Sequence, residues 1–183
     1  MPLDFLLPFV TIGLAELLDK SQLSILLLSS RTKNYIQLFL GVMLAFLIID
    51  GSAVLIGTYA NSLISPTYTK VIASLLFIIF GILSLRESKK DHATITSPKN
   101  IFITGFTMVA FAEFGDKTQI ATALFATKFN PLLVLVGVLT TLAIITIVTI
   151  ILGQSITKIL SRRTLNKVAG IIFIALGILF LLV

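Results

Sequence analysis

The sequence contains no cysteine, which excludes disulfide bonds and thiolate metal sites. Its single histidine, His92, lies in a polar segment, where a solvated side chain is the expected environment. Because neither thiolate nor imidazole is available within the apolar runs, a site for Zn²⁺ or Cu⁺ is disfavoured. Charged residues are also scarce, at 12% of the chain, and they are bunched into short segments. The net charge of +6 comes mostly from loops and does not suggest nucleic-acid binding.

Apolar residues are abundant instead. They make up 57% of the chain, against about 45–50% in soluble domains, and the mean hydropathy is +1.09. Polar segments divide the chain into six apolar runs, and about 17–25 residues suffice to cross a bilayer. The first run lacks a basic segment before it, so we do not expect a cleavable signal peptide. The runs are Phe5–Ser30, Tyr35–Ala60, Tyr68–Leu85, Ile101–Thr127, Leu132–Ile156 and Val168–Val183.

A charged motif occurs twice within these apolar runs. It reads Ala-Glu-Leu-Leu-Asp-Lys-Ser-Gln at 15–22 and Ala-Glu-Phe-Gly-Asp-Lys-Thr-Gln at 112–119. Each ionised group at the bilayer centre costs roughly 2.5–3.5 kcal/mol, so a doubled motif indicates function. We expect each copy to lie on an α-helix, where its Glu, Asp and Lys share one face, which its Gln extends. A structural ion pair between the Glu and the Lys of one copy is the alternative interpretation.

The similarity between the halves extends beyond the motif, at an offset of 96–97 residues. Gly41-Val42 corresponds to Gly137-Val138, for example, and Gly81-Ile82-Leu83 to Gly177-Ile178-Leu179. The sequence therefore predicts an all-α integral membrane protein with six transmembrane helices, arranged as two inverted three-helix repeats. The predicted units are a first repeat at 1–85, a cytoplasmic linker at 86–100 and a second repeat at 101–183.

The basic residues predict the orientation. Ten of the 14 Lys and Arg residues lie in the first, third and fifth connections, whereas only Lys70 and Lys128 lie on the other side. Because basic loops stay cytoplasmic, we expect both termini to face outward.

The inverted repeat predicts where the motifs meet. Its pseudo-two-fold axis would bring the first and fourth runs together, and four adjacent carboxylates cannot all stay ionised in a low dielectric. Lys20 and Lys117 balance two charges, and the other two suit one divalent cation or two protons. Carboxylate, amide and hydroxyl oxygens favour hard ions such as Ca²⁺, Mn²⁺ and Mg²⁺. The predicted ligands are Glu16, Asp19, Ser21, Gln22, Glu113, Asp116, Thr118 and Gln119.

Several of these residues have alternative roles. Ser21 and Thr118 could hydrogen-bond to their own helix carbonyls, and the two Gln residues could join helices. Asp50 is a further acid, and its counterpart in the second half is near Thr146. It could relay protons, add a ligand, pair with a motif lysine or lie hydrated near the interface.

The doubled pattern Glu-x-Gly-Asp-Lys-Ser/Thr resembles the signature of uncharacterised protein family 0016, the Gdt family of Ca²⁺/Mn²⁺:H⁺ exchangers. The resemblance covers nearly the whole chain. The second copy fits fully, whereas Leu18 stands where the family has glycine in the first. The resemblance implies export of Mn²⁺ or Ca²⁺ from the cytosol in exchange for protons, with the four motif acids as ligands. It also implies a compact prokaryotic member in the plasma membrane.

We therefore expect a secondary transporter that works by alternating access, rather than an enzyme. Its expected partners are the lipid bilayer, a divalent cation and protons; a homodimer is left open, and no cofactor beyond the transported cation is expected. An exporter of small polar organic solutes, such as basic amino acids, is the alternative, because a doubled acidic face could also hold an ammonium group. The sequence does not choose between Mn²⁺ and Ca²⁺.

Overall fold

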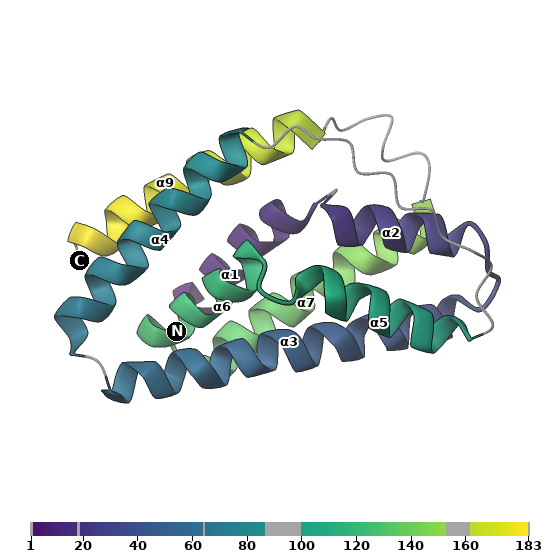
Figure 1. The fold of residues 1–183 in the computed structure, drawn as a ribbon, viewed down its shortest axis with the longest axis horizontal. Coiled ribbons are helices and arrows are strands. Elements are labelled where there is room, and N and C mark those ends of the chain that lie inside the picture. Colours follow the sequence, from purple (N-terminus) through teal and green to yellow (C-terminus); the bar gives the residue numbers. More distant parts are fainter. Residues whose placement is uncertain (1, 18, 64, 87–99, 153–161, 183) are drawn as a thin grey trace.

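The computed structural model describes residues 2–17, 19–63, 65–86, 100–152 and 162–182. Within these residues the chain is all-helical and contains no strand (Figure 1). Most of the linker predicted at 86–100, including His92, lies outside the described residues. The helices are α1 (Pro2–Glu16), α2 (Lys20–Ser29), α3 (Tyr35–Leu63), α4 (Pro66–Arg86), α5 (Ile101–Glu113), α6 (Lys117–Lys128), α7 (Pro131–Leu152) and α9 (Arg162–Leu182).

The helices follow the six predicted apolar runs. The second, third, fifth and sixth runs each correspond to one helix, α3, α4, α7 and α9, within the described residues. Two of these helices contain apolar stretches long enough to cross a membrane, Tyr35–Ala60 in α3 and Pro131–Ile151 in α7. Shorter apolar stretches occupy α4, α5 and α9. The first and fourth runs differ from the prediction, because each is divided into two helices.

The two divisions fall on the charged motifs, so the prediction of a continuous motif helix was wrong. In the first copy α1 ends at Glu16 and α2 begins at Lys20, and in the second copy α5 ends at Glu113 and α6 begins at Lys117. Gly115 has φ +77°, a left-handed conformation that glycine adopts without steric cost. Asp116 follows it as the extended N-cap of α6. Glycine and aspartate are weak helix formers that favour helix ends, which accounts for the second break.

Each long helix packs against the divided helix of the other half. Helix α3 packs against α5 and α6, and α7 packs against α1 and α2. Glycines allow close approach at equivalent places: a Cβ at Gly41 would meet the backbone of Phe102, and one at Gly137 would meet that of Phe5. Gly137 follows Gly41 by 96 residues and Phe102 follows Phe5 by 97 residues, which is the offset of the predicted repeat.

Helices α4 and α9 form a close pair (Figure 1). A Cβ at Gly81 would lie 2.7 Å from the carbonyl oxygen of Gly170, and one at Gly177 would lie 2.8 Å from that of Ser74. Gly177 follows Gly81 by 96 residues, and Gly170 follows Ser74 by 96 residues, so the repeat offset relates these two contacts as well. The pair packs against α1 and α6, and therefore borders both divided helices.

An aromatic cluster joins this pair to α6. Its rings lie 5.3–6.2 Å apart between centroids. Lys128, at the end of α6, lies 4.6 Å from the ring centroid of Phe180 and donates to its carbonyl oxygen at 3.4 Å. The cluster consists of Phe77, Phe125, Phe129, Phe173 and Phe180.

Candidate metal centre

The helix breaks determine where the motif acids lie. Glu16 and Glu113 are the last residues of α1 and α5, whereas Asp19 and Asp116 immediately precede α2 and α6. The start of a helix carries unpaired N–H groups and a partial positive charge, which stabilises a nearby carboxylate. Irregular backbone at membrane depth is tolerated where it lines a site inside the protein. Each motif therefore supplies carboxylates at a helix break rather than along one helical face.

The structure brings the two copies together, as the predicted symmetry required. One carboxylate oxygen from each of Glu16, Asp19 and Asp116 lies within 4.8 Å of the other two. Among the described residues this group combines acids from both halves of the chain, and Glu113 is not a member. Glu16 and Asp19 are buried, at 1% and 7% exposed, and Asp116 is partly exposed. The acids thus form a compact, largely buried set of hard oxygen ligands.

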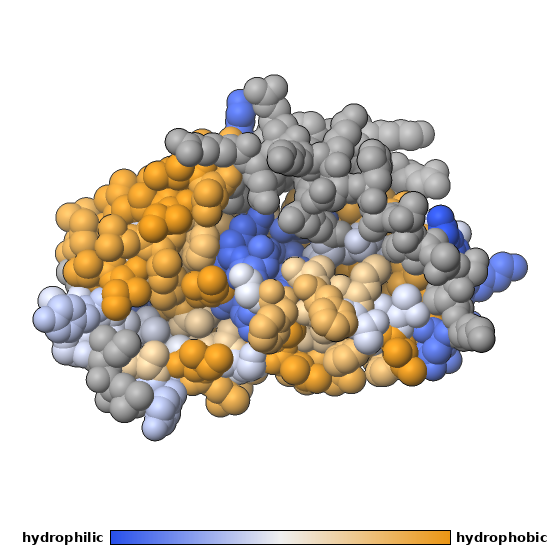
Figure 2. All heavy atoms as spheres, in the orientation of Figure 1, coloured by the Kyte–Doolittle hydropathy of each residue, from blue (hydrophilic) through white to orange (hydrophobic). Residues whose placement is uncertain are grey.

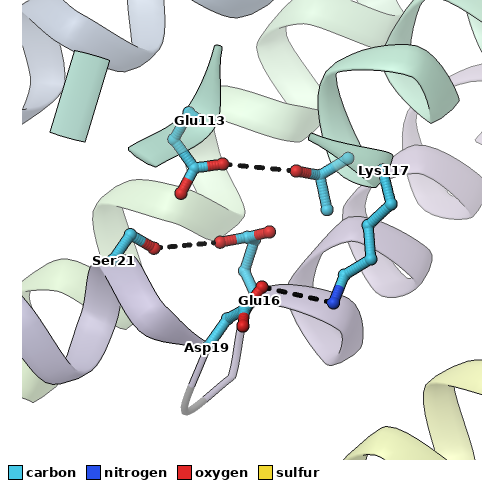
Figure 3. A network of polar contacts seen from close by, with 6 residues as sticks. Glu16, Asp19, Ser21, Glu113 and Lys117 are labelled. Atoms are coloured by element: carbon cyan, nitrogen blue, oxygen red, sulfur yellow. Dashed lines mark hydrogen bonds and ion pairs between the residues drawn. The ribbon is translucent and has the colours of Figure 1, made fainter. Parts of the chain in front are cut away.

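Lys117 links the two motifs. Its Nζ lies 3.2 Å from Oδ2 of Asp19, and both side chains are about nine-tenths buried. Figure 3 shows this lysine reaching across to Asp19, with Glu16 and Glu113 in the same network. The resolved pair joins one motif copy to the other, whereas the alternative interpretation placed a pair within one copy. The side chain of Lys20 and the whole of Leu18 lie outside the described residues.

The motif hydroxyls contact the motif glutamates. Ser21 donates to Oε2 of Glu16 at 3.2 Å, and Thr118 donates to Oε2 of Glu113 at 3.3 Å (Figure 3). Both donors are buried and lie five residues after their acceptors. These bonds orient the two glutamates, and they differ from the helix-carbonyl bonds considered as an alternative for these hydroxyls.

The two motif glutamines join helices. Oε1 of Gln119 accepts from the backbone N–H of Gly115 at 2.7 Å, and its Nε2 approaches the carbonyl of Ile49 and the hydroxyl of Ser52 on α3 at 3.4 and 3.5 Å. Oε1 of Gln22 accepts from Thr149 on α7 at 3.0 Å. The interhelical role considered for these glutamines is therefore present for both.

Three hydroxyl partners, one each on α3, α6 and α7, were not identified from the sequence. Thr122 donates to Oδ1 of Asp50 at 3.0 Å, and both residues are buried. Asp50 therefore faces α6, and the close oxygen group contains a different set of acids. Thr149 and Ser52, which contact the motif glutamines, were also not predicted as partners. A single hydroxyl in an apolar run does not show which helix it faces, so these pairs had no clear signal.

The surroundings of the centre are partly open. Figure 2 shows hydrophilic side chains gathered in a hollow at the middle of one face, beside the hydrophobic surface of α4 and α9. Asp116, Lys117 and Gln119 are partly exposed. Carboxylate, hydroxyl and amide oxygens are the groups that hard divalent cations accept, so the residues gathered here are candidate ligands for such an ion.

Comparison with known proteins agrees with this chemistry. A family model described as "Divalent cation/proton antiporter GDT1" matches residues 4–92 and 101–183. A Vibrio cholerae protein named "Putative manganese exporter" is 28% identical over 170 residues, which cover 92% of this chain and 85% of that protein. The rice (Oryza sativa subsp. japonica) "GDT1-like protein 5" is 27% identical over 208 residues, covering 91% and 88% of the two chains.

A third relative is similar over a shorter region. The Saccharomyces cerevisiae protein named "Divalent cation/proton antiporter GDT1" is 37% identical over 76 residues, which cover 42% of this chain and 27% of the yeast protein. No solved structure matches the chain.

Proposed function

This chain belongs to the GDT1 family of divalent cation/proton antiporters, and from that premise we propose that it exports Mn²⁺ or Ca²⁺ from the cytosol in exchange for protons. The observation that carries the proposal is the close group of carboxylate oxygens from Glu16, Asp19 and Asp116. A buried set of hard oxygen ligands is suited to either ion. The name of the Vibrio cholerae relative adds support for Mn²⁺ as the cargo.

The exchange follows from charge balance. The motif glutamates and aspartates would bring four negative charges to one region, and the motif lysines would bring two positive charges. In a low dielectric the remaining two charges require neutralisation, either by one divalent cation or by two protons. The cation and the protons therefore exclude one another at the centre, and alternation between these two states is an antiport cycle.

The proposed architecture has six membrane crossings in two inverted repeats, at 1–85 and 101–183, joined by a linker at 86–100. The glycine contacts that recur at an offset of 96–97 residues support it, as do the equivalent bonds of Ser21 and Thr118. Helix α1 begins and helix α9 ends on the side of the bundle away from the α2–α3 connection, which supports this arrangement (Figure 1). With the basic connections in the cytoplasm, both termini face outward from the plasma membrane.

The individual residues have the following proposed roles. Glu16, Asp19 and Asp116 bind the cation, and Glu113 adds negative charge from outside their close group. Ser21 and Thr118 hold the two glutamates in place. Lys117 competes with the cation for Asp19, and Lys20 is assigned the same charge-balancing role by its place in the motif. Asp50, buried beside Thr122 at the centre of α3, is assigned to proton relay.

Transport in proteoliposomes tests this proposal. Purified protein would be reconstituted with a pH-sensitive dye inside the vesicles, and Mn²⁺, Ca²⁺ or a basic amino acid would be added outside. We expect Mn²⁺ or Ca²⁺ to drive proton movement in the opposite direction, and Asp116→Asn to abolish it. Asp4→Asn, which changes an acid outside the motifs in the first turn of α1, is the matched control. Proton movement driven by the amino acid alone would replace this proposal with the organic-solute exporter.

A further inference from the structure

Three buried polar atoms have no hydrogen-bond partner within the described residues: Oε1 of Glu16, Nε2 of Gln22 and Oγ1 of Thr146. A buried polar group without a partner destabilises the fold, so a native structure keeps few of them. These atoms come from α1, α2 and α7, the helices of the first motif and the long helix that packs against it. Their common location suggests a shared cause.

Two contacts determine the depth of Thr146 in the bundle. At the middle of α7, the side chain of Thr141 lies where a Cβ on Gly13 would be. Farther along, Thr149 donates to Gln22. Since α1, the break and α2 run past α7 between these contacts, Thr146 lies at the level of the break that carries Glu16 and Asp19. Thr146 and Thr149 are three residues apart and share a helical face within about 60°.

The other half of the molecule is different at the equivalent place. The counterpart of Thr146, at an offset of 96 residues, is Asp50, which accepts a hydrogen bond from Thr122. The counterpart of Gln22 is Gln119, whose oxygen and nitrogen both have partners. The unpartnered atoms are thus found on the first-half side of the centre, next to the close group of acids.

We propose that Thr146 is a further cation-binding residue, which places its hydroxyl oxygen beside Oε1 of Glu16 on the first-half side of the metal centre. This inference rests on the proposed function, because the ligand it names is the transported divalent cation. A hydroxyl and a carboxylate oxygen are both ligands that Mn²⁺ and Ca²⁺ accept.

Gln22 can join the same ligand set by turning its amide over. A 180° rotation of the amide group exchanges the positions of its oxygen and nitrogen. This rotation needs no movement of the helix. In the turned orientation Nε2 donates to the hydroxyl of Thr149, and Oε1 takes the place of the unpartnered nitrogen. Of the three atoms unpartnered within the described residues, the cation then gives a partner to Oε1 of Glu16 and to Oγ1 of Thr146, and the turned amide gives one to Nε2 of Gln22.

Thr146→Val tests the proposal, because valine keeps the shape of the side chain and removes the hydroxyl. We measure the thermal midpoint of purified protein with and without Mn²⁺, and the KM for Mn²⁺ in proteoliposomes. Removal of an unpartnered hydroxyl should raise the midpoint without Mn²⁺, while the increase caused by Mn²⁺ becomes smaller. We expect the KM to rise by about tenfold. A purely structural hydroxyl would not change the response to Mn²⁺.

Two further variants control the result. Thr140→Val makes the same change on α7 at a hydroxyl that bonds to the carbonyl of Val136, and it should leave the response to Mn²⁺ unchanged. Thr146→Ser keeps the hydroxyl and should restore a KM close to that of the unmodified protein. If Thr146→Val gives an unchanged KM, or if Thr146→Ser is as impaired as Thr146→Val, the assignment is wrong.

The failure of the assignment is distinguishable from failure of the proposed function. If the unmodified protein responds to Mn²⁺ or Ca²⁺ in either assay and Thr146→Val responds equally, only the role of Thr146 is excluded. If the unmodified protein responds to neither ion, the proposed function and the assignment are both overturned.

Discussion

The two halves of the metal centre carry the same motif but are tied differently to the helices around them. On the second-half side, Gln119 approaches two groups on α3 and Thr122 donates to Asp50 on the same helix. On the first-half side, the bond between Thr149 and Gln22 is the side-chain hydrogen bond resolved between α7 and α2 in the described residues. Among the described residues, the second motif therefore has more resolved side-chain hydrogen bonds to its long neighbouring helix than the first.

The aromatic cluster adds to this difference. Phe125 and Phe129 attach α6 to the α4–α9 pair, and Lys128 contacts Phe180 through its charge and through a hydrogen bond. The counterparts of these two phenylalanines, at an offset of 97 residues, are Leu28 and Thr32, so the first half cannot form the same cluster. We infer that, among the described residues, the second motif is the more firmly packed side of the centre.

The largest expected effect comes from comparing Glu16→Gln with Glu113→Gln. Glu16 belongs to the close group of oxygens, whereas Glu113 lies outside it. Glu16→Gln should therefore lower kcat/KM for Mn²⁺-driven proton exchange by roughly 100-fold, or ~2.7 kcal/mol. Glu113→Gln should lower it by about tenfold, as expected for a group that acts through the ligands. If the two variants lose kcat/KM equally in proteoliposomes, the two glutamates contribute equally to the centre, which would contradict this comparison.

Much of this arrangement could be predicted from the sequence. The six apolar runs and the repeat offset were visible as patterns of composition, because lipid exposure requires long apolar helices. The convergence of the motifs followed from the same repeat and is confirmed for Glu16, Asp19 and Asp116. These predictions depend on features averaged over many residues, and one unusual backbone conformation does not disturb them.

The helix breaks were missed because the prediction assumed a continuous helix through each motif. In the second copy a local signal existed, since Gly115 and Asp116 are a residue pair that favours a helix end followed by an N-cap. In the first copy Leu17 and Leu18 give no such signal. The partners of Asp50 and Gln22 were beyond prediction for another reason, because they depend on how the faces of two long apolar helices are rotated.

A second comparison concerns the bonds that hold each motif helix. Thr122→Val removes the donor to the buried carboxylate of Asp50 and should lower the free energy of unfolding by about 1–3 kcal/mol. Thr149→Val removes the donor to a neutral amide, and about 0.5–1.5 kcal/mol is expected. Chemical denaturation in detergent measures both, with Thr140→Val as the control. A larger loss for Thr149→Val would contradict the firmer attachment of the second motif.

A third comparison tests the break itself, at the one position where the second copy has glycine and the first has leucine. An added Cβ on Gly115 would meet no atom within 4 Å, so Gly115→Ala acts only through the backbone, where φ is +77°. A left-handed conformation costs a residue other than glycine about 1–2 kcal/mol, and we expect a loss of that size in the free energy of unfolding. Gly51 is also open to a Cβ but lies inside α3, where Gly51→Ala should instead stabilise by roughly 0.5–1 kcal/mol. Since both substitutions add one methyl group in open space, opposite signs in the same denaturation experiment isolate the backbone conformation. A neutral or stabilising Gly115→Ala would mean that α5 and α6 do not need the left-handed residue between them.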